Sequence, residues 1–548
     1  MKITKILLTN FRSFQNTQTI ELAPVTLLFG PNSVGKSSVL MALAYVQQIL
    51  KHGHCNPQKL EALGNKKIGG FRSLVFGQNT KSSIKIRLEF ESGSTPFIDY
   101  DSGLDEMSNY LNVDYLLMKD FAGSIKNGGI ELEVCWSNRH QYGYVKNYRV
   151  WINDAYIGCI ASSPDCRNTV IRELNSFHPL LIPYNHDDWL EYNFGDEKEN
   201  APFEEDYIHT EFEEVLDRLN PNPIDTANEA DVDGAGTHFK NFIAPIAIVC
   251  NNGAIPILGR PVSTYLAGQE FEDQSDHFNF LALKQTLSQA FVLPLDKILE
   301  HLDKSVFIGP LRVVPDIDYI PNPHPEQHDW VDGSAAWDLL HKNPISDDPI
   351  KKLLRQTSDW LSSENKLDTG YEVINQSLSD SLEQKNSIIP AIDGLMKKRH
   401  LLFREIRTNI DLSANQLGTG ISQVLPIVVA ANYDSVELIT VEQPELHIHP
   451  RMQVELADLL VSARDKHSFL IETHSEHLIL RLLKRIRQST DKELPEGIKA
   501  VDGNDICIVY LEPSKSGVIA KRIHIDEDGE FCGQWPQGFF IERREELM

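Results

Sequence analysis

A glycine-rich segment constrains the fold more than any other part of this chain of 548 residues. Residues 30–37 read Gly-Pro-Asn-Ser-Val-Gly-Lys-Ser, between the apolar run 25–29 and the helix-like run 38–45. A strand that delivers such a loop to a helix N-terminus places backbone N–H groups around a phosphate. The segment predicts a nucleoside triphosphate site in which Lys36 contacts the β- and γ-phosphates and Ser37 binds Mg²⁺. The alternative is a glycine-rich turn that buries an amine.

Composition limits the partners and the compartment. Lys and Arg number 52 against 78 Asp and Glu, and the resulting net charge of −26 argues against wrapping nucleic acid with the whole surface. Seven cysteines without a C-x-x-C pair indicate neither a zinc ribbon nor a disulfide framework, which fits the reducing cytosol. The first residues resemble no signal peptide, and the longest later apolar run, 242–250, is too short to span a bilayer. We therefore expect a cytoplasmic protein without membrane contact.

The pattern along the chain predicts an α/β fold in four regions. Residues 1–100 form an N-terminal lobe with the glycine-rich loop. Residues 101–305 form a large mixed, partly helical insertion, whose acidic segment 185–233 reads as a solvated insert or, less often, as an acidic docking surface. Residues 306–500 form a second α/β lobe, and residues 501–548 form a small β-rich C-terminal cap.

Two local expectations are more specific. Helices are predicted after the polar stretch 315–347, up to about Leu382. The acids at 526–528 precede Gly529, which predicts a hairpin turn rather than a nuclease carboxylate pair.

Acidic strand ends downstream supply the second half of the predicted site. The run 436–445 reads Val-Glu-Leu-Ile-Thr-Val-Glu-Gln-Pro-Glu, a buried strand that ends in carboxylates. If this strand lies beside the strand of the glycine-rich loop, Glu442 comes close to the metal, the Walker B role. A further apolar strand, 468–472, ends in Thr-His-Ser, and His474 there would be placed to sense the γ-phosphate.

A second candidate anion site lies between these motifs. Residues 417–423 read Leu-Gly-Thr-Gly-Ile-Ser-Gln and precede the helix-like run 424–432. Two glycines and hydroxyls at a helix N-terminus form an anion site. Because the first loop holds the chain's own nucleotide, the second suggests the γ-phosphate of a nucleotide bound to another molecule. The residues of this site are Gly418, Thr419, Gly420 and Ser422.

Taken in order, these motifs resemble a known class of ATPase. The segments that carry the resemblance are Asn10-Phe11-Arg12-Ser13-Phe14, the glycine-rich loop, 418–423, 442–450 and 472–475. They are similar to the ABC-type ATPase heads of the Rad50/SMC/RecF class and, within it, to the OLD-like ATPases. The tail 533–540 resembles the C-terminal cap of the PtuA ATPases of Septu antiphage systems, including those found beside retrons. The resemblance covers about residues 1–90 and 300–548.

The resemblance implies a P-loop NTPase fold of the ABC-ATPase head type. It also implies a homodimer, or a higher homo-oligomer, that sandwiches two ATP molecules with Mg²⁺. Glu442 would belong to the Mg²⁺ shell, Thr419 and Gly420 would meet the partner's γ-phosphate, and His474 would be the switch histidine. Gln78 is the candidate for the glutamine that reaches the metal. The residues implied to contact nucleotide phosphates are Arg12, Asn32, Ser33, Val34, Gly35, Lys36, Ser37 and Ser38.

One position departs from the pattern of the class. Most of these heads have, after the Walker B acid, a glutamate that polarises the attacking water, and here that residue is Gln443. An amide cannot accept a proton at neutral pH, so hydrolysis should be slow unless Glu445 or another group substitutes. We therefore expect a protein that holds ATP more than it hydrolyses it.

Two functions fit this sequence. The first is an ABC-type ATPase subunit of an antiphage complex, whose ATP-bound dimers scaffold and restrain a separate HNH nuclease. A reverse transcriptase and retron DNA would be further partners. The alternative is a RecF-like clamp for DNA repair or recombination.

Three smaller features carry open interpretations. The basic clusters 397–407 and 481–487 are either nucleic-acid or partner surfaces, or solvated faces. Histidine pairs at 447–449 and 474–477 permit a metal site, although they fall on motif positions with nucleotide or dimer roles. Arg312, in the segment 309–312, is expected to be structural, with a role in the site as the alternative.

Overall fold

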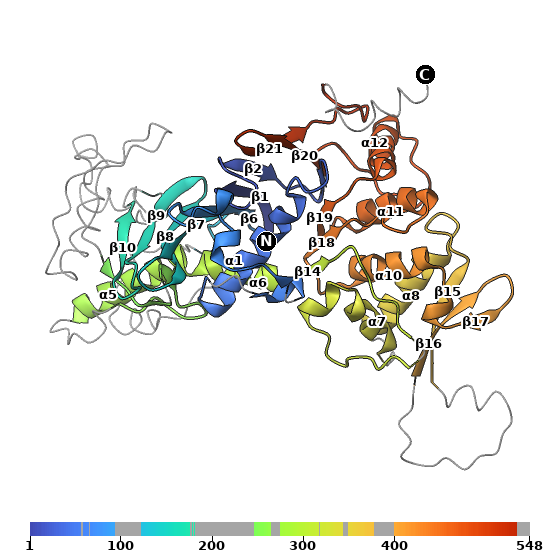
Figure 1. Ribbon diagram of the computed structural model, residues 1–548, viewed down its shortest axis with the longest axis horizontal. Coiled ribbons are helices and arrows are strands. Elements are labelled where there is room, and N and C mark those ends of the chain that lie inside the picture. Colours follow the sequence, from blue (N-terminus) through green and yellow to red (C-terminus); the bar gives the residue numbers. More distant parts are fainter. Residues whose placement is uncertain are drawn as a thin grey trace, which may run out of the picture. The chain divides into compact units, whose positions relative to one another are not determined.

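The computed structural model describes residues 1–55, 59–64, 66–93, 122–175, 178, 180, 246–251, 253–264, 274–316, 318–342, 349–377 and 399–533. The chain forms two compact units (Figure 1). The first comprises Met1–Thr19, Tyr45–Gln58 and Ile68–His301, and the second comprises Ile20–Ala44, Lys59–Lys67 and Leu302–Met548. The acidic segment 185–233, Lys397, Lys398 and the tail from 534 onward lie outside the described residues.

The first unit is built on a sheet in the order β11-β10-β9-β8-β7-β6-β1-β2, in which the pairs from β11 to β1 are antiparallel. Its strands are β1 (Lys2–Thr9), β2 (Gln18–Glu21), β6 (Ile84–Glu91), β7 (Asn127–Ser137), β8 (Tyr142–Ile152), β9 (Ala155–Ser162), β10 (Thr169–Leu174) and β11 (Ile246–Ala247). Apolar and polar residues alternate strictly along β6, and its apolar residues are the buried ones. This strand therefore has one buried and one more exposed face.

Shorter elements complete this unit. They are the hairpin of β12 (Cys250–Asn251) and β13 (Ile255–Pro256) and the helices α5 (Gln274–Phe291) and α6 (Leu293–Asp303). The helices of the predicted partly helical region 101–305 thus lie near its end, and short strands precede them.

A largely parallel sheet forms the centre of the second unit. Its order is β14-β18-β19-β3-β20-β21, and β21 alone runs antiparallel to its neighbour. The strands are β3 (Val25–Phe29), β14 (Ser305–Ile308), β18 (Leu438–Glu442), β19 (Ser468–Glu472), β20 (Ile506–Ser514) and β21 (Gly517–Ile523). Every residue of β3 is buried, as expected for a central strand of a covered parallel sheet. The predicted α/β, P-loop ATPase fold is confirmed.

The strand order corrects one expectation. The Walker B strand β18 is not the neighbour of β3, because β19 lies between them. Glu472 of β19 pairs in register with Glu442 on one side and Leu28 on the other. All three strands are short apolar runs, so their local patterns could not rank them across the sheet.

Helices connect and cover these strands. They are α1 (Lys36–His52), α7 (Ser334–His341), α8 (Pro349–Ser362), α10 (Thr419–Asn432), α11 (Pro450–Ala463) and α12 (Glu476–Asp491). In Figure 1, α10, α11 and α12 follow one another along the same side of β18 and β19. Residues 422–431 of α10 are all buried, which makes this helix a central part of the core. Within the described ranges, every helix is too short or too polar to cross a lipid bilayer.

A small antiparallel sheet replaces helix that the sequence predicted up to Leu382. After α8, the chain forms β15 (Tyr371–Ser377), which pairs with β16 (Arg399–Glu405), and β16 pairs with β17 (Ile410–Leu412). Val373 lies opposite the buried Phe403 and packs against the core of the unit. This pairing joins residues far apart in the chain, so a local pattern could not show it.

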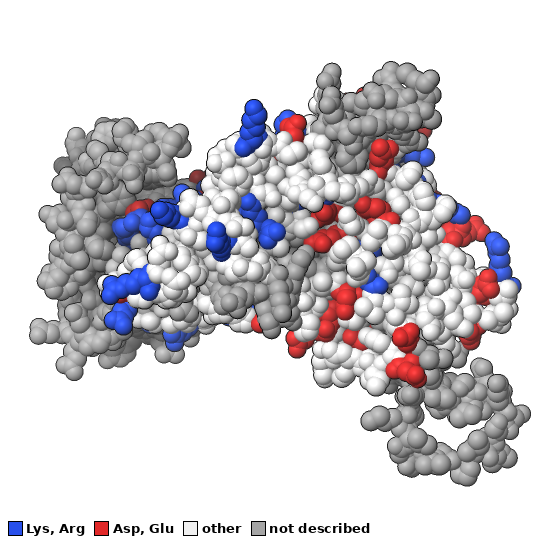
Figure 2. Space-filling view, in the orientation of Figure 1, with Lys and Arg blue, Asp and Glu red and all other residues white. Residues whose placement is uncertain are grey.

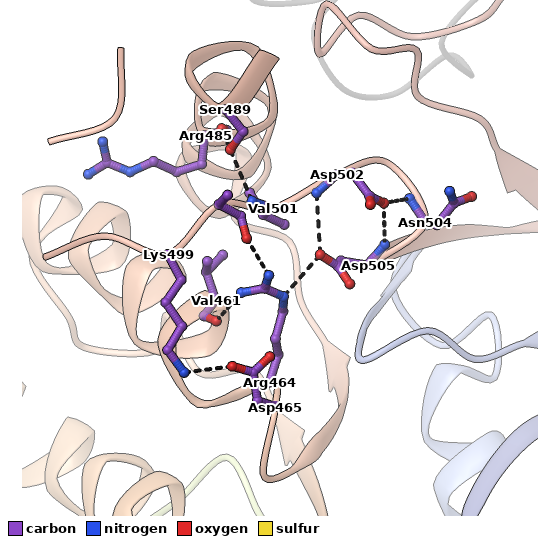
Figure 3. A network of polar contacts seen from close by, with 11 residues as sticks. Val461, Arg464, Asp465, Arg485, Ser489, Lys499, Val501, Asp502, Asn504 and Asp505 are labelled. Carbon is purple, nitrogen blue, oxygen red and sulfur yellow. Dashed lines mark hydrogen bonds and ion pairs between the residues drawn. The ribbon is translucent and has the colours of Figure 1, made fainter. Parts of the chain in front are cut away.

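A polar network joins α11, α12 and the start of β20 (Figure 3). Arg464 donates to the carboxylate of Asp505 at 3.0 Å and to the carbonyl of Val461 at 2.8 Å. The carbonyl of Asp505 in turn accepts from the N–H of Val25 at 2.9 Å, the first residue of β3. The network therefore fixes the base of the strand that delivers the glycine-rich loop.

The basic cluster 481–487 is used largely within the chain. Arg485 is buried and donates to both oxygens of Asp458, at 2.7 and 2.6 Å. Arg481 bonds Glu455 at 2.5 Å, and Arg487 bonds the carbonyl of Asp528 at 2.8 Å. These arginines hold α12 to α11 and to the turn at 526–529. That turn, closed by the Gly529 N–H on the carbonyl of Asp526 at 3.1 Å, confirms the predicted hairpin.

Candidate nucleotide-binding site

The loop between β3 and α1 turns through three residues of positive φ, namely Gly30 (144°), Ser33 (62°) and Gly35 (112°). A Cβ on Gly30 would lie 2.5 Å from the carbonyl oxygen of Leu511 in β20, so the loop requires glycine there. Asn32 and Ser33 are exposed, whereas Val34 is buried and anchors the loop. The strand, loop and helix predicted from the sequence are all present.

The side chain of Lys36 turns back into this loop. Its ammonium group is buried and donates to the carbonyls of Gly30 and Pro31, each at 3.0 Å. Burial lowers the pKa of Lys36, while the nearby carboxylates of Glu472 and Glu445 oppose that shift. The amine is thereby held at the centre of the loop, where it would neutralise a phosphate.

Glu472 contacts the loop more closely than sequence reasoning anticipated. Its carboxylate accepts from the Ser37 hydroxyl at 2.7 Å and lies 3.9 Å from the Lys36 nitrogen. Burial raises the pKa of Glu472, the Ser37 hydrogen bond and Lys36 oppose the shift, and the carboxylates of Glu442 and Glu445 add to it. The signal was present in the sequence, because Glu472 ends an apolar strand just as Glu442 does.

The donors at this point fit Mg²⁺. A hydroxyl from Ser37 and carboxylates from Glu442 and Glu472 are the hard oxygen ligands that this ion prefers. Among the described residues, no group of three or more His, Cys, Asp or Glu is arranged to hold a metal. Mg²⁺ would therefore depend on phosphate oxygens as well, as it does at most nucleotide sites. The histidine pairs at 447–449 and 474–477 belong to no such group either.

Glu445 fastens the loop after β18 to the loop after β19. One of its oxygens accepts from the Thr473 hydroxyl and the other from the backbone N–H of His474, both at 2.7 Å. Burial lowers the pKa of His474, the charge of Lys36 lowers it further, and the carboxylate of Glu445 opposes the shift. Gln443 has a φ of 46° and donates its N–H to the carbonyl of Glu472 at 2.7 Å.

The second candidate anion site lies at the start of α10. Gly418 caps the helix, and both Gly418 and Thr419 are exposed. Gly420 is half-buried, and a Cβ there would lie 3.1 Å from the carbonyl of His447. Ser422 is fully buried, and its hydroxyl has no hydrogen-bond partner among the described residues. Gly418 and Thr419 are therefore the groups of this motif that an external phosphate would meet.

Two predicted residues belong to the first unit. Arg12 has a φ of 50°, and its N–H donates to the carbonyl of Leu74 at 2.7 Å. The N–H of Phe76 donates to the carbonyl of Asn10 at 3.2 Å, so the turn at 10–14 lies beside the segment that carries the exposed Gln78. Burial lowers the pKa of Arg12. The structure brings these two loops together, and their contacts with nucleotide stay a prediction.

A comparison with protein families identifies the chain. A sequence profile described as AAA ATPase domain matches residues 1–220 and 327–479, which is more than half of the chain. The chain belongs to this family. The chain is therefore an ATPase, and the match includes the glycine-rich loop and the ends of β18 and β19. None of the curated proteins matches the chain.

Solved structures of SMC heads are similar over nearly the whole length. The SMC head domain from Thermotoga maritima is 9% identical with a TM-score of 0.37, and the match covers 96% of this chain and 100% of that one. An Smc head bound to the C-terminal winged-helix domain of ScpA gives 8% identity, a TM-score of 0.36 and coverage of 96% and 99%. The Smc head from Pyrococcus furiosus, with an extended coiled coil and bound to the C-terminal domain of ScpA, is 10% identical with a TM-score of 0.34. That match covers 100% of this chain and 98% of the other. Because these TM-scores lie below 0.5, the family assignment depends on the sequence profile alone.

Proposed function

We propose that this ATPase acts as an ABC-type head of the SMC and Rad50 kind, which binds ATP between two copies of the chain. One observation carries this proposal. The second unit holds a complete glycine-rich loop with its own lysine and also an exposed helix N-terminus at Gly418 and Thr419. A helix N-terminus attracts an anion, and the nucleotide of a second copy supplies one.

The polar contacts of the site support slow hydrolysis. Gln443 stands where a general base would be expected, and its amide cannot take a proton from water. Glu445 already accepts hydrogen bonds at both oxygens, and Glu472 is bonded to Ser37. We infer that Glu445 positions the His474 loop rather than the attacking water, so that ATP remains bound for long periods.

A protein that keeps ATP bound for long periods is better suited to hold a partner protein inactive than to drive repeated movements by hydrolysis. We infer that ATP-bound dimers, or larger assemblies of them, scaffold and silence a separate HNH nuclease in the cytoplasm as part of an antiphage complex of the Septu type. A reverse transcriptase and retron DNA would be further partners. The order of the sequence motifs supports this assignment, and the slow chemistry inferred for Gln443 is consistent with it.

The Lys36→Ala variant tests the nucleotide site. Removing this amine should weaken MgATP binding by at least about 100-fold, because residues 30–37 contain no other cationic side chain. Lys51→Ala, at the exposed end of the same helix, is the control and should bind as the wild type does. Isothermal titration calorimetry measures both. Unchanged affinity in a folded Lys36→Ala protein would remove the assignment.

The larger assignment needs its own experiment. Purification of the native complex, with mass spectrometry of its proteins and sequencing of its nucleic acids, should recover an HNH nuclease. A complex that contains this chain with no nuclease would refute the antiphage role and leave the ATPase assignment intact.

A further inference from the structure

Arg312 is a buried cation that binds carbonyl oxygens from three parts of the second unit. It follows β14 and is only 5% exposed. Its guanidinium donates to the carbonyl of Gly309 at 3.1 Å and to that of Gln423 at 2.9 Å. It also donates to the carbonyls of Glu442 at 3.2 Å and Gln443 at 3.4 Å. The side chain thus spans from α10 to the end of the Walker B strand.

The contact with α10 is reciprocal. The side-chain amide of Gln423 donates to the carbonyl of Arg312 at 2.7 Å and accepts from its N–H at 3.3 Å. Gln423 is buried in the second turn of the helix that begins at the exposed Thr419. The two residues therefore exchange hydrogen bonds through both backbone and side chain, and a displacement of one would displace the other.

Burying a charged guanidinium costs free energy, and a purely structural contact would not require it. No carboxylate among the described residues forms an ion pair with Arg312, so its charge is stabilised by four carbonyl dipoles and, at longer range, by the carboxylate of Glu445. Burial lowers the pKa of Arg312 to about 10. A buried charge without a directly bonded counter-ion is unfavourable, and an apolar side chain of similar size would pack here at lower cost. The guanidinium, however, offers what no apolar residue can, namely several donors in a fixed plane that reach different segments at once.

The segments that it joins have different roles. The 442–443 peptide belongs to the chain's own nucleotide site, and the N–H of Gln443 is also bonded to the carbonyl of Glu472, whose side chain holds Ser37. The start of α10 is the site proposed for the nucleotide of a second copy. A continuous path of hydrogen bonds therefore runs from Ser37 through Glu472, Gln443 and Arg312 to α10.

We propose that Arg312 is a positioning residue that couples the two nucleotide sites, so that filling the chain's own site sets the position of the Thr419 loop for the second copy. This inference rests on the proposed ATP sandwich. Arg312 touches no phosphate in this scheme. It acts through the backbone of Gln443 and the first turns of α10.

Two variants, Arg312→Met and Gln423→Met, break the contact from opposite sides. Each should leave MgATP affinity in the monomer within about threefold of wild type, because neither side chain enters the glycine-rich loop. Each should weaken MgATP-dependent self-association, measured by sedimentation velocity, by at least about tenfold. Arg312→Lys, which keeps the charge but loses the planar set of donors, should fall between.

Arg464→Met is the matched control, because Arg464 is also a buried arginine that braces the same unit but lies at the base of β3. It should lower the unfolding midpoint while leaving association in MgATP within about threefold of wild type. Wild-type association in a folded Arg312→Met or Gln423→Met protein would overturn the coupling. Equal losses of ATP affinity and association would also overturn it, since Arg312 would then only support its own site. A wild-type protein that does not associate in MgATP would instead show that the sandwich itself is wrong.

Discussion

Three glutamates and one glutamine at the ends of β18 and β19 have different contacts in the candidate nucleotide site. Glu472 binds the Ser37 hydroxyl, and Glu445 fastens the loop of His474. Glu442 ends the Walker B strand in register with Glu472. Gln443 follows Glu442, and we propose that it stands where a general base would take a proton from water. We therefore expect the Gln443 amide to limit the rate of ATP hydrolysis.

Gln443→Glu should raise ATP turnover by about 10²–10⁴-fold, the usual contribution of a general base. Phosphate release at saturating MgATP measures this, and Gln15→Glu, an exposed site in the first unit, is the control for added charge. Rapid turnover in the wild type without any gain in Gln443→Glu would show that another residue is the base.

Glu472→Gln tests the carboxylate that the sequence reading did not single out. Because burial raises the pKa of Glu472 in the fold, the folded state binds this proton more tightly than the unfolded state. Its contribution to stability is complete below the unfolded pKa of about 4.3 and is lost as pH rises through the folded value. Without nucleotide and Mg²⁺, the variant should therefore unfold at a higher temperature than wild type at pH 7, and the difference should shrink toward pH 4.

Thermal unfolding across this pH range, followed by circular dichroism, provides the measurement. Parallel curves for the two proteins would contradict the shift. With MgATP the order should reverse if Glu472 binds the metal shell, because the amide has lost the negative charge that attracts Mg²⁺.

The sequence predicts those strands and helices whose formation depends on contiguous residues. The buried strand 25–29, the loop and the start of α1 form one continuous stretch, and each residue type there favours the structure observed. The strands that end at Glu442 and Glu472 are recognisable as apolar runs. Strand order and the sheet of β15 to β17 depend on pairing between distant segments. Glu472 was overlooked for this reason, since only the position of β19 beside β3 brings it to Ser37.

The ion pair between Arg485 and Asp458 should be a structural element of the α11–α12 contact. Both side chains are buried, and they share two hydrogen bonds. Arg485→Met leaves the carboxylate of Asp458 buried with a weaker partner, which should lower the free energy of unfolding by about 3–5 kcal/mol. Urea unfolding measures this, with Lys484→Met at the exposed neighbouring position as control. Equal stability of the two variants would mean that Arg481 compensates fully.

Thr419→Glu tests the start of α10 as a phosphate site. A glutamate at the first position of a helix stabilises it, so the fold should be kept, but its charge would repel a γ-phosphate. Association in MgATP should therefore fall by at least about tenfold while binding of ATP to the monomer is retained. Ser516→Glu, in the exposed turn between β20 and β21, adds the same charge elsewhere and should have no effect. Equal association of both variants would argue against the sandwich.

Charged side chains are distributed unevenly between the surfaces of the two units. On the face seen in Figure 2, Asp and Glu predominate over the second unit, whereas Lys and Arg are more frequent over the first. With a net charge of −26, nucleic acid can be bound only locally. The antiparallel sheet of the first unit, whose strands β7 to β11 lie within the region 101–305, could not be placed by sequence resemblance and emerges only from long-range strand pairing.

The last prediction joins the chemistry of one residue to the behaviour of the assembly. If ATP-bound dimers restrain a nuclease, a chain that hydrolyses its ATP quickly should release that restraint. Cells that express the complete complex with Gln443→Glu should therefore grow more slowly than cells with the wild-type complex and should accumulate broken DNA, measured by plating and by gel electrophoresis of chromosomal DNA. In cells whose nuclease has an inactivated catalytic site, the same substitution should leave growth normal, because the damage requires cleavage.

Normal growth of the Gln443→Glu strain, with raised turnover shown for the purified protein, would mean that ATP retention does not keep the nuclease inactive. Toxicity that persists with the inactive nuclease would assign the effect to the ATPase itself.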